Sequence, residues 1–193
     1  MRNLIINERK TVPEEAFRRW SEIIAAKVIN TDHYKEAKSV FCFVSVTGEP
    51  DTSTIIKRAF IDGKTVCVPR TAPGGQMDAV PVDSDAFGMT GSEWPKNYGI
   101  PEPPLLYKKA DLLYPSLVIV PSVAVDRQGY RLGHGGGYYD RFISGYLSAQ
   151  KRPVFMAIQF SVFLRDEIQP RESGDKPVDM IVTENEIILF SFA

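Results

Sequence analysis

The most constraining feature of this sequence is the near-continuous apolar run LVIVPSVAV, which spans Leu117–Val125. A strand buried on both faces of a sheet shows this pattern, because neither face needs polar residues. Pro121 interrupts the run, which predicts that the regular ladder ends there. Strands of this kind occur almost only in parallel sheets covered by helices, so the run indicates an α/β fold.

Hydrophobic periodicity elsewhere agrees with this class. Apolar residues at helical spacing predict helices over 13–29, 51–61 and 138–147. Short β-branched and aromatic runs predict strands over 39–46, 65–68 (ended by Pro69), 154–160, 180–183 and 187–190. The expected architecture is a three-layer α/β sandwich with a mostly parallel central sheet and helices on both faces. The chain length of 193 residues fits a single domain over 1–193.

Residues 71–115 differ from the rest of the chain, because they are rich in Pro, Gly and Asp and show no sustained period. A connection of that length inside a compact domain is usually functional or mobile. We interpret it as a lid or substrate wall. The alternative is an irregular surface excursion whose aromatic side chains pack on the core.

Composition limits the classes of partner. The formal net charge of −1 gives no global field that would recruit nucleic acid or an anionic membrane. Cys42 and Cys67 lie in apolar runs and are expected to be buried, reduced thiols in strands. We see no signal peptide and no run long enough for a membrane span. A cytoplasmic protein, monomeric or weakly dimeric, is therefore expected.

The stretch RLGHGGGYYDRF, residues 131–142, follows the apolar run and leads into the last predicted helix. Consecutive glycines let a ligand approach the main chain, and a helix start offers unpaired N–H groups, so the stretch predicts a phosphate site. It is neither a Walker loop, which needs Gly-Lys-Ser/Thr, nor a dinucleotide fingerprint, which would need glycine at Tyr138. A tight structural turn remains the alternative. Asp140 would either hold Mg²⁺ beside a phosphate or only add charge at the helix start.

Several quoted segments together resemble one family. VIVPSVAVDRQGYRLGHGGGYYDRF is similar to the signature of the 5-formyltetrahydrofolate cyclo-ligase family, also called 5,10-methenyltetrahydrofolate synthetase. GEPDT (48–52), YGIPEP (98–103) and the ending with Pro170, Asp175, Asp179 and IVTE (181–184) follow the family's order. The resemblance implies ATP- and Mg²⁺-dependent cyclisation of 5-formyltetrahydrofolate to 5,10-methenyltetrahydrofolate, with release of ADP and phosphate, through a phosphorylated formyl oxygen.

The resemblance also implies roles for individual residues. Catalytic roles fall to Arg131, Tyr138 and Asp140, and metal binding to Asp140 and Asp175. ATP would contact Arg2, Arg131, Leu132, Gly133, His134, Gly135, Gly136, Gly137, Tyr138 and Tyr139. Folate would contact Val44, Glu49, Met77, Trp94, His134 and Tyr138. Glu49 suits the pterin, because a carboxylate accepts two hydrogen bonds from an amino-pyrimidinone edge.

The sequence departs from the family pattern at three places. Family members usually have an N-terminal lysine that contacts ATP, and this sequence has no counterpart for it. Arg2 is the candidate for that phosphate contact, unless the true start lies upstream. Gly174 replaces the usual histidine before Asp175, and Gln159 is a candidate for a glutamine that is common after the late strand. Two alternative functions stay open: a non-catalytic folate- or nucleotide-binding homologue, and a sugar-phosphate isomerase-like enzyme on a related fold.

Overall fold

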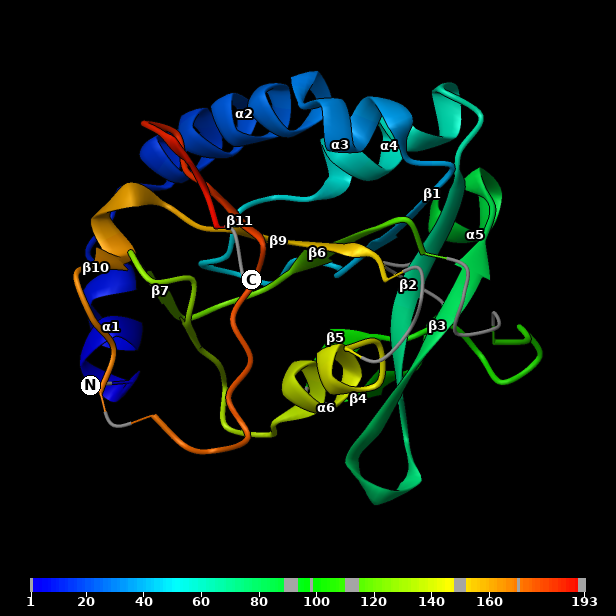
Figure 1. The fold of residues 1–193 in the computed structure, drawn as a ribbon. Helices are drawn as coiled ribbons and strands as arrows, with labels where there is room; N and C mark the ends of the chain where they lie inside the picture. The colour runs from blue at the N-terminus through cyan, green and yellow to red at the C-terminus, as the bar shows by residue number, and fades with distance from the viewer. Residues whose placement is uncertain are drawn as a thin grey trace.

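The computed structural model describes residues 2–88, 94–97, 99–109, 115–147, 152–169 and 171–190. Its centre is a seven-stranded sheet in the order β12-β11-β9-β6-β1-β2-β3 (Figure 1). These strands are β1 (Ser39–Cys42), β2 (Thr65–Ala72), β3 (Gln76–Val82), β6 (Leu117–Val120), β9 (Val154–Ile158), β11 (Met180–Val182) and β12 (Ile187–Leu189). The five interior strands are parallel and both edge strands are antiparallel, which confirms the mostly parallel sheet.

Helices cover both faces of this sheet. On one face lie α2 (Glu14–Asn30), α3 (Asp32–Glu36) and α4 (Ser53–Ile61), and on the other lies α6 (Tyr138–Ser144) (Figure 1). Side chains alternate between the two faces along a strand, so β1 sends Val40 and Cys42 into one apolar cluster and Phe41 into the other. Phe142 of α6 packs on Phe41, with ring centroids 4.9 Å apart. The predicted three-layer sandwich is confirmed, and both cysteines are buried and free.

The apolar run Leu117–Val125 divides into two strands. β6 ends at Val120, directly before Pro121, as predicted. After the break, β7 (Ala124–Asp126) joins a separate three-stranded sheet with β8 (Arg131–Leu132) and β10 (Leu164–Arg165). The glycine run therefore follows β8 of this small sheet rather than a core strand directly. The buried Asp126 causes the turn between β7 and β8, because its carboxylate accepts the main-chain N–H groups of Gln128 and Tyr130.

The expectation that β2 ends at Pro69 is wrong, and so is the absence of regular structure over 76–82. β2 continues to Ala72 and forms a hairpin with β3 through a 3-10 turn, η1 (Pro73–Gly75). The pairing of β1 with β2 stops at Phe41 and Cys67, so Pro69 lies where only β3 flanks β2. A proline without an N–H donor is tolerated at such an edge.

The remaining elements are short. They are α5 (Ser84–Gly88), β4 (Lys96–Asn97), β5 (Ile100–Pro101) and η2 (Ser161–Phe163), with the N-terminal helix α1 (Arg2–Arg9), which the sequence patterns did not indicate. α1 packs through Ile5, which is buried.

Among the helices in the described ranges, none is both long and apolar enough to cross a membrane. Tyr98 and Pro170 of the quoted motifs lie outside the described residues.

Candidate active site at the glycine loop

Residues 133–137, called the glycine loop from here on, connect β8 to α6. Gly135 has a φ of 103° and Gly137 a φ of 64°, values that L side chains rarely adopt. Among the described residues, no hydrogen bond engages the main-chain N–H groups of residues 134–137. The loop therefore presents several unpaired donors on a backbone that lacks side chains at four of its five positions, 133, 135, 136 and 137. Such concave runs of N–H groups are typical anion sites.

Two arginine side chains donate hydrogen bonds to main-chain carbonyl oxygens of the same loop. Arg2 Nε donates to the carbonyl oxygen of Gly133 at 2.7 Å, and Arg141 Nη2 donates to that of Gly136 at 2.6 Å. Arg2 also lies over Gly135, where an added Cβ would be only 2.9 Å from Arg2 Nη1. The carbonyls of Gly133 and Gly136 are thus satisfied while the N–H groups of 134–137 stay free, and positive charge lies beside these N–H groups. Both features favour a phosphate over a neutral ligand.

Arg141 also joins the glycine loop to the β2–β3 hairpin. Its Nε donates to the carbonyl oxygen of Gly75 at the hairpin tip, at 2.7 Å. Its guanidinium lies 5.3 Å from the ring centroid of Tyr138, and that ring folds back over Gly136. The tip of an edge hairpin, far away in sequence, therefore lies against the loop.

Glu49 connects the glycine loop to the first strand. It lies in the turn after β1, its side chain is 6% exposed, and its Oε2 accepts the Val46 N–H at 3.1 Å. Its Oε1 is 3.3 Å from Nε2 of His134 in the loop. The residue predicted for folate and the loop predicted for ATP thus meet in one place, although 85 positions separate them.

Arg9 lies beneath this junction, and the sequence did not mark it as a site residue. The side chain of this α1 residue is buried, and its Nη2 donates to the carbonyl oxygens of Ser122 and Val123 at 2.6 and 2.8 Å. Burial lowers the pKa of the Arg9 guanidinium, and the negative charge of Glu49 opposes this shift. Gln159 is fully buried beside it and donates to the same Ser122 carbonyl at 2.7 Å.

Asp140, in the first turn of α6, accepts two hydrogen bonds on the same oxygen. Arg131 Nη2 and the Lys176 N–H reach its Oδ1 at 2.9 and 3.1 Å. Asp175 precedes Lys176, and its Oδ2 accepts the Glu172 N–H at 2.8 Å. Across the described residues, no hydrogen bond uses the second oxygen of either carboxylate. The structure brings the two predicted metal residues into neighbouring segments.

The donor set fits Mg²⁺ only in part. In the described segments, no group of three or more His, Cys, Asp or Glu side chains is placed to hold a metal ion. Magnesium, however, usually takes one or two carboxylates and completes its shell with water and substrate phosphates. Asp140 and Asp175, each with one oxygen held and one free, match that pattern near the glycine loop.

The two tyrosines after the loop point to different surroundings. Tyr138 is half-buried between Gly136 and Arg141, whereas Tyr139 stacks on Phe41 between the sheet and α6, with ring centroids 6.4 Å apart. The Tyr139 hydroxyl is buried and makes no hydrogen bond with the described residues. Burial raises the pKa of Tyr139 well above its ordinary value, so the phenol stays protonated.

The remaining folate candidates do not form one cluster. Val44 is half-buried in the segment after β1, and Trp94 is 6% exposed with its ring centroid 6.4 Å from that of Tyr107. Both pack in the cluster that faces α2. Met77 of β3 is 9% exposed and packs in the opposite cluster, with Phe142.

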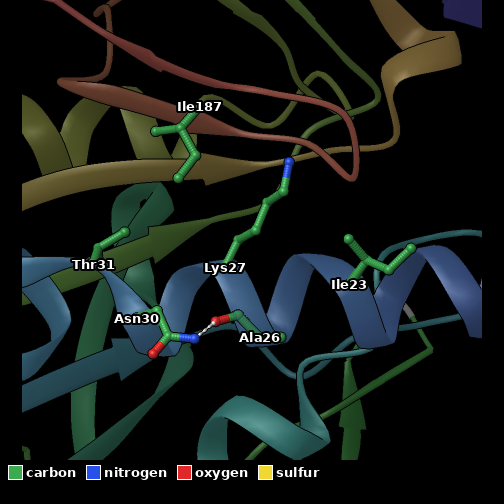
Figure 2. A pocket seen from close by; sticks show the side chains of 6 residues that line it. All are labelled: Ile23, Ala26, Lys27, Asn30, Thr31 and Ile187. Atoms are coloured by element: carbon green, nitrogen blue, oxygen red, sulfur yellow. Dashed lines mark hydrogen bonds between the residues drawn. The ribbon is translucent and has the colours of Figure 1, made fainter.

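Two hollows lie away from the glycine loop. One, of about 390 Å³, lies between α2 and β12 and is lined by Ile23, Ala26, Lys27, Asn30, Thr31 and Ile187 (Figure 2). The other, of about 570 Å³, lies beside α2 and α4 and is bordered by Tyr34, Asp62 and Lys64. Neither includes a residue predicted for ATP, folate or metal.

Comparison with known proteins places the chain in a family. A sequence profile of the 5-formyltetrahydrofolate cyclo-ligase family matches residues 1–184. A Caenorhabditis elegans protein described as a probable 5-formyltetrahydrofolate cyclo-ligase is 32% identical over 188 residues, which covers 93% of this chain and 88% of the relative. A Schizosaccharomyces pombe protein of the same description is 31% identical over 175 residues, which covers 86% and 84%.

Solved structures agree. The NMR structure of Aquifex aeolicus 5,10-methenyltetrahydrofolate synthetase has a TM-score of 0.79 and 26% identity, over 97% of this chain and 90% of that chain. A Mycoplasma pneumoniae 5,10-methenyltetrahydrofolate synthetase shares the fold, with a TM-score of 0.73 at 16% identity over 95% and 96% of the two chains. The chain belongs to the 5-formyltetrahydrofolate cyclo-ligase family.

Proposed function

We propose that this protein converts 5-formyltetrahydrofolate to 5,10-methenyltetrahydrofolate with ATP as co-substrate. The observation that carries the proposal is the contact between His134 and Glu49, at 3.3 Å. It joins a loop of unpaired main-chain donors to a buried carboxylate suited to a pterin edge. One substrate supplies phosphate, which the N–H donors would bind, and the other a ring system with adjacent N–H donors, which the carboxylate would accept.

In this proposal the glycine loop binds the ATP phosphates through its free N–H groups. Arg2 adds positive charge at the loop, and Arg131, Leu132, Tyr138 and Tyr139 frame it on both sides. Phosphoryl transfer depends on alignment and on neutralising spread negative charge, so main-chain donors and arginines are the required groups. No general base needs to be assigned, and His134 acts as a hydrogen-bond donor.

Asp140 and Asp175 would hold Mg²⁺ beside the phosphates. The ion would neutralise charge on the transferred group. The protein's own contribution is to keep one oxygen of each carboxylate fixed by main-chain or arginine donors, which orients the other oxygen.

Folate would lie on the Glu49 side of the loop. The Glu49 carboxylate would accept two hydrogen bonds from the amino-pyrimidinone edge, with Arg9 balancing its charge from below. Tyr138 and Val44 would line the pocket. Residues 71–115 would form its outer wall within the single domain 1–193, on the side of Trp94, whereas Met77 packs in the opposite cluster and would lie outside the pocket.

The chemistry proceeds in two steps. The formyl oxygen attacks the γ-phosphorus, the bond to the bridging oxygen breaks, and ADP leaves. The neighbouring folate nitrogen then attacks the activated carbon, the carbon–oxygen bond breaks, phosphate departs, and that nitrogen loses its proton. Phosphorylation is needed because the formyl oxygen is otherwise a poor leaving group.

Mixing the protein with ATP, Mg²⁺ and 5-formyltetrahydrofolate tests the proposal. We expect the methenyl chromophore to appear together with an equal amount of ADP. Binding of both ligands without product would instead identify a non-catalytic homologue, and failure to bind ATP would favour the isomerase-like alternative. With heavy oxygen in the formyl group, the label should appear in the released phosphate, and its retention in any other product would reject the phosphorylated intermediate.

A further inference from the structure

The Arg131 side chain, on β8, makes its side-chain hydrogen bonds with Asp140 and Lys176. It is 3% exposed, so its guanidinium is almost fully removed from water. A buried charge requires partners, and Arg131 has them within the protein. Its Nη1 donates to the Lys176 carbonyl oxygen at 2.9 Å and its Nη2 to Asp140 Oδ1, also at 2.9 Å.

These contacts form a closed ring of three hydrogen bonds. Arg131 binds Asp140 Oδ1, the Lys176 N–H donates to the same Oδ1, and the Lys176 carbonyl accepts from Arg131. The ring joins β8, the first turn of α6 and the segment that carries Asp175. A guanidinium can span two acceptors in one plane, whereas an ammonium is a single point of charge.

We infer that Arg131 is a positioning residue, which fixes the Asp140 carboxylate and the adjoining Asp175 segment rather than touching the phosphates of ATP. The inference rests on the proposed function, because it assumes that these carboxylates meet a divalent cation beside the nucleotide. Arg131 and the Lys176 N–H together occupy Asp140 Oδ1 and thereby leave Oδ2 as the oxygen available to the cation. Residues that orient metal-binding side chains typically change metal affinity when they are replaced, by about 10- to 100-fold.

The test separates metal affinity from nucleotide affinity. Arg131→Lys keeps the charge but does not span both acceptors. Titration with ADP in EDTA reports nucleotide binding alone, and the loss of the free Mn²⁺ paramagnetic resonance signal in the presence of ADP reports metal binding. We expect ADP affinity in EDTA to change by less than about twofold and Mn²⁺ affinity to fall by about 10-fold or more.

Arg127→Lys is the matched control, because Arg127 makes a comparable paired contact with Glu186 on the surface and should change neither value. A loss of ADP affinity in EDTA as large as the loss of Mn²⁺ affinity would overturn the inference, since Arg131 would then contact phosphate. If the wild-type protein binds neither ADP nor Mn²⁺, the proposed function itself fails.

A second measurement covers the case in which Arg131→Lys does not fold, as shown by its thermal unfolding. A crystal structure of the wild-type protein with Mn²⁺ and a non-hydrolysable ATP analogue would show the contacts of Arg131 directly. We expect both terminal nitrogens to remain on Asp140 and Lys176. A terminal nitrogen within hydrogen-bond distance of a phosphate oxygen would contradict the inference.

Discussion

His134 Nε2 lies 3.3 Å from Glu49 Oε1, and this contact joins the glycine loop to the turn after the first strand. Glu49 is 6% exposed and His134 is 55% exposed, so the carboxylate is held by the protein while the imidazole lies at the surface. Pairs in which one partner is this exposed contribute about 0–1 kcal/mol. The contact therefore places the two proposed subsites side by side without fixing them rigidly.

Glu49→Gln should weaken folate binding and leave ATP binding almost unchanged. The amide presents a donor to a pterin donor, so one charge-assisted hydrogen bond is lost, at about 1.5–3 kcal/mol. Titration calorimetry with each ligand separates the two affinities. Glu186→Gln, which removes the charge of an exposed carboxylate paired with Arg127, is the control and should alter neither. Equal losses for both ligands would mean that Glu49 supports the fold beside Arg9 rather than binding folate.

Gly135→Ala should impair nucleotide binding far more than Gly133→Ala. The φ of 103° at Gly135 is unfavourable for alanine by about 1–3 kcal/mol. Its Cβ would also lie 2.9 Å from Arg2 Nη1, whereas a Cβ at Gly133 meets nothing within 4 Å. Fluorescent ATP-analogue titration of both variants measures the effect. Similar affinities in the two variants would show that the loop conformation is unimportant for binding.

Arg141→Lys should release the tip of the β2–β3 hairpin. Lysine can reach the carbonyl of Gly75 or that of Gly136, but its single ammonium does not span both as the guanidinium does. Amide hydrogen exchange should accelerate over 73–77, with a loss of about 1 kcal/mol in unfolding free energy. Arg58→Lys within α4 serves as the control. Unchanged exchange at the hairpin tip would contradict the prediction.

Tyr139→Phe should raise the free energy of unfolding by about 1 kcal/mol, because it removes a buried hydroxyl that lacks a partner. Tyr34→Phe is the opposite case, since the Tyr34 hydroxyl donates to Asp62 at 3.0 Å and its loss should destabilise. Urea unfolding of both variants measures the difference. Destabilisation of Tyr139→Phe would reveal a partner for that hydroxyl, such as a bound water.

The parallel sheet could be predicted from the sequence because its strands are continuous apolar runs. β3 could not, because Asp78 and Pro81 break its pattern and Pro69 suggested that β2 had already ended. The deciding fact is tertiary: β1 stops pairing at Cys67, so β2 becomes an edge that accepts a proline and pairs with β3. Local pattern contains no information about which neighbour a strand has at each residue.

For the site, the glycine loop was recognisable from its composition, and Glu49 from the family order. The direction of the Arg131 side chain was not, because its acceptor Lys176 lies 45 positions further along the chain. Arg9 was missed for a similar reason. An arginine near the N-terminus normally remains in water, and only the placement of α1 against Ser122 buries it.

Phosphate binding by the glycine loop is tested most directly by NMR. The amide resonances of the loop are recorded while a non-hydrolysable ATP analogue and Mg²⁺ are added. We expect the N–H signals of residues 134–137 to move most and to become protected from exchange, while those of 23–31 around the α2 hollow stay in place. If the nucleotide binds and the signals of 134–137 do not change, the phosphates lie elsewhere and the proposed mechanism is wrong.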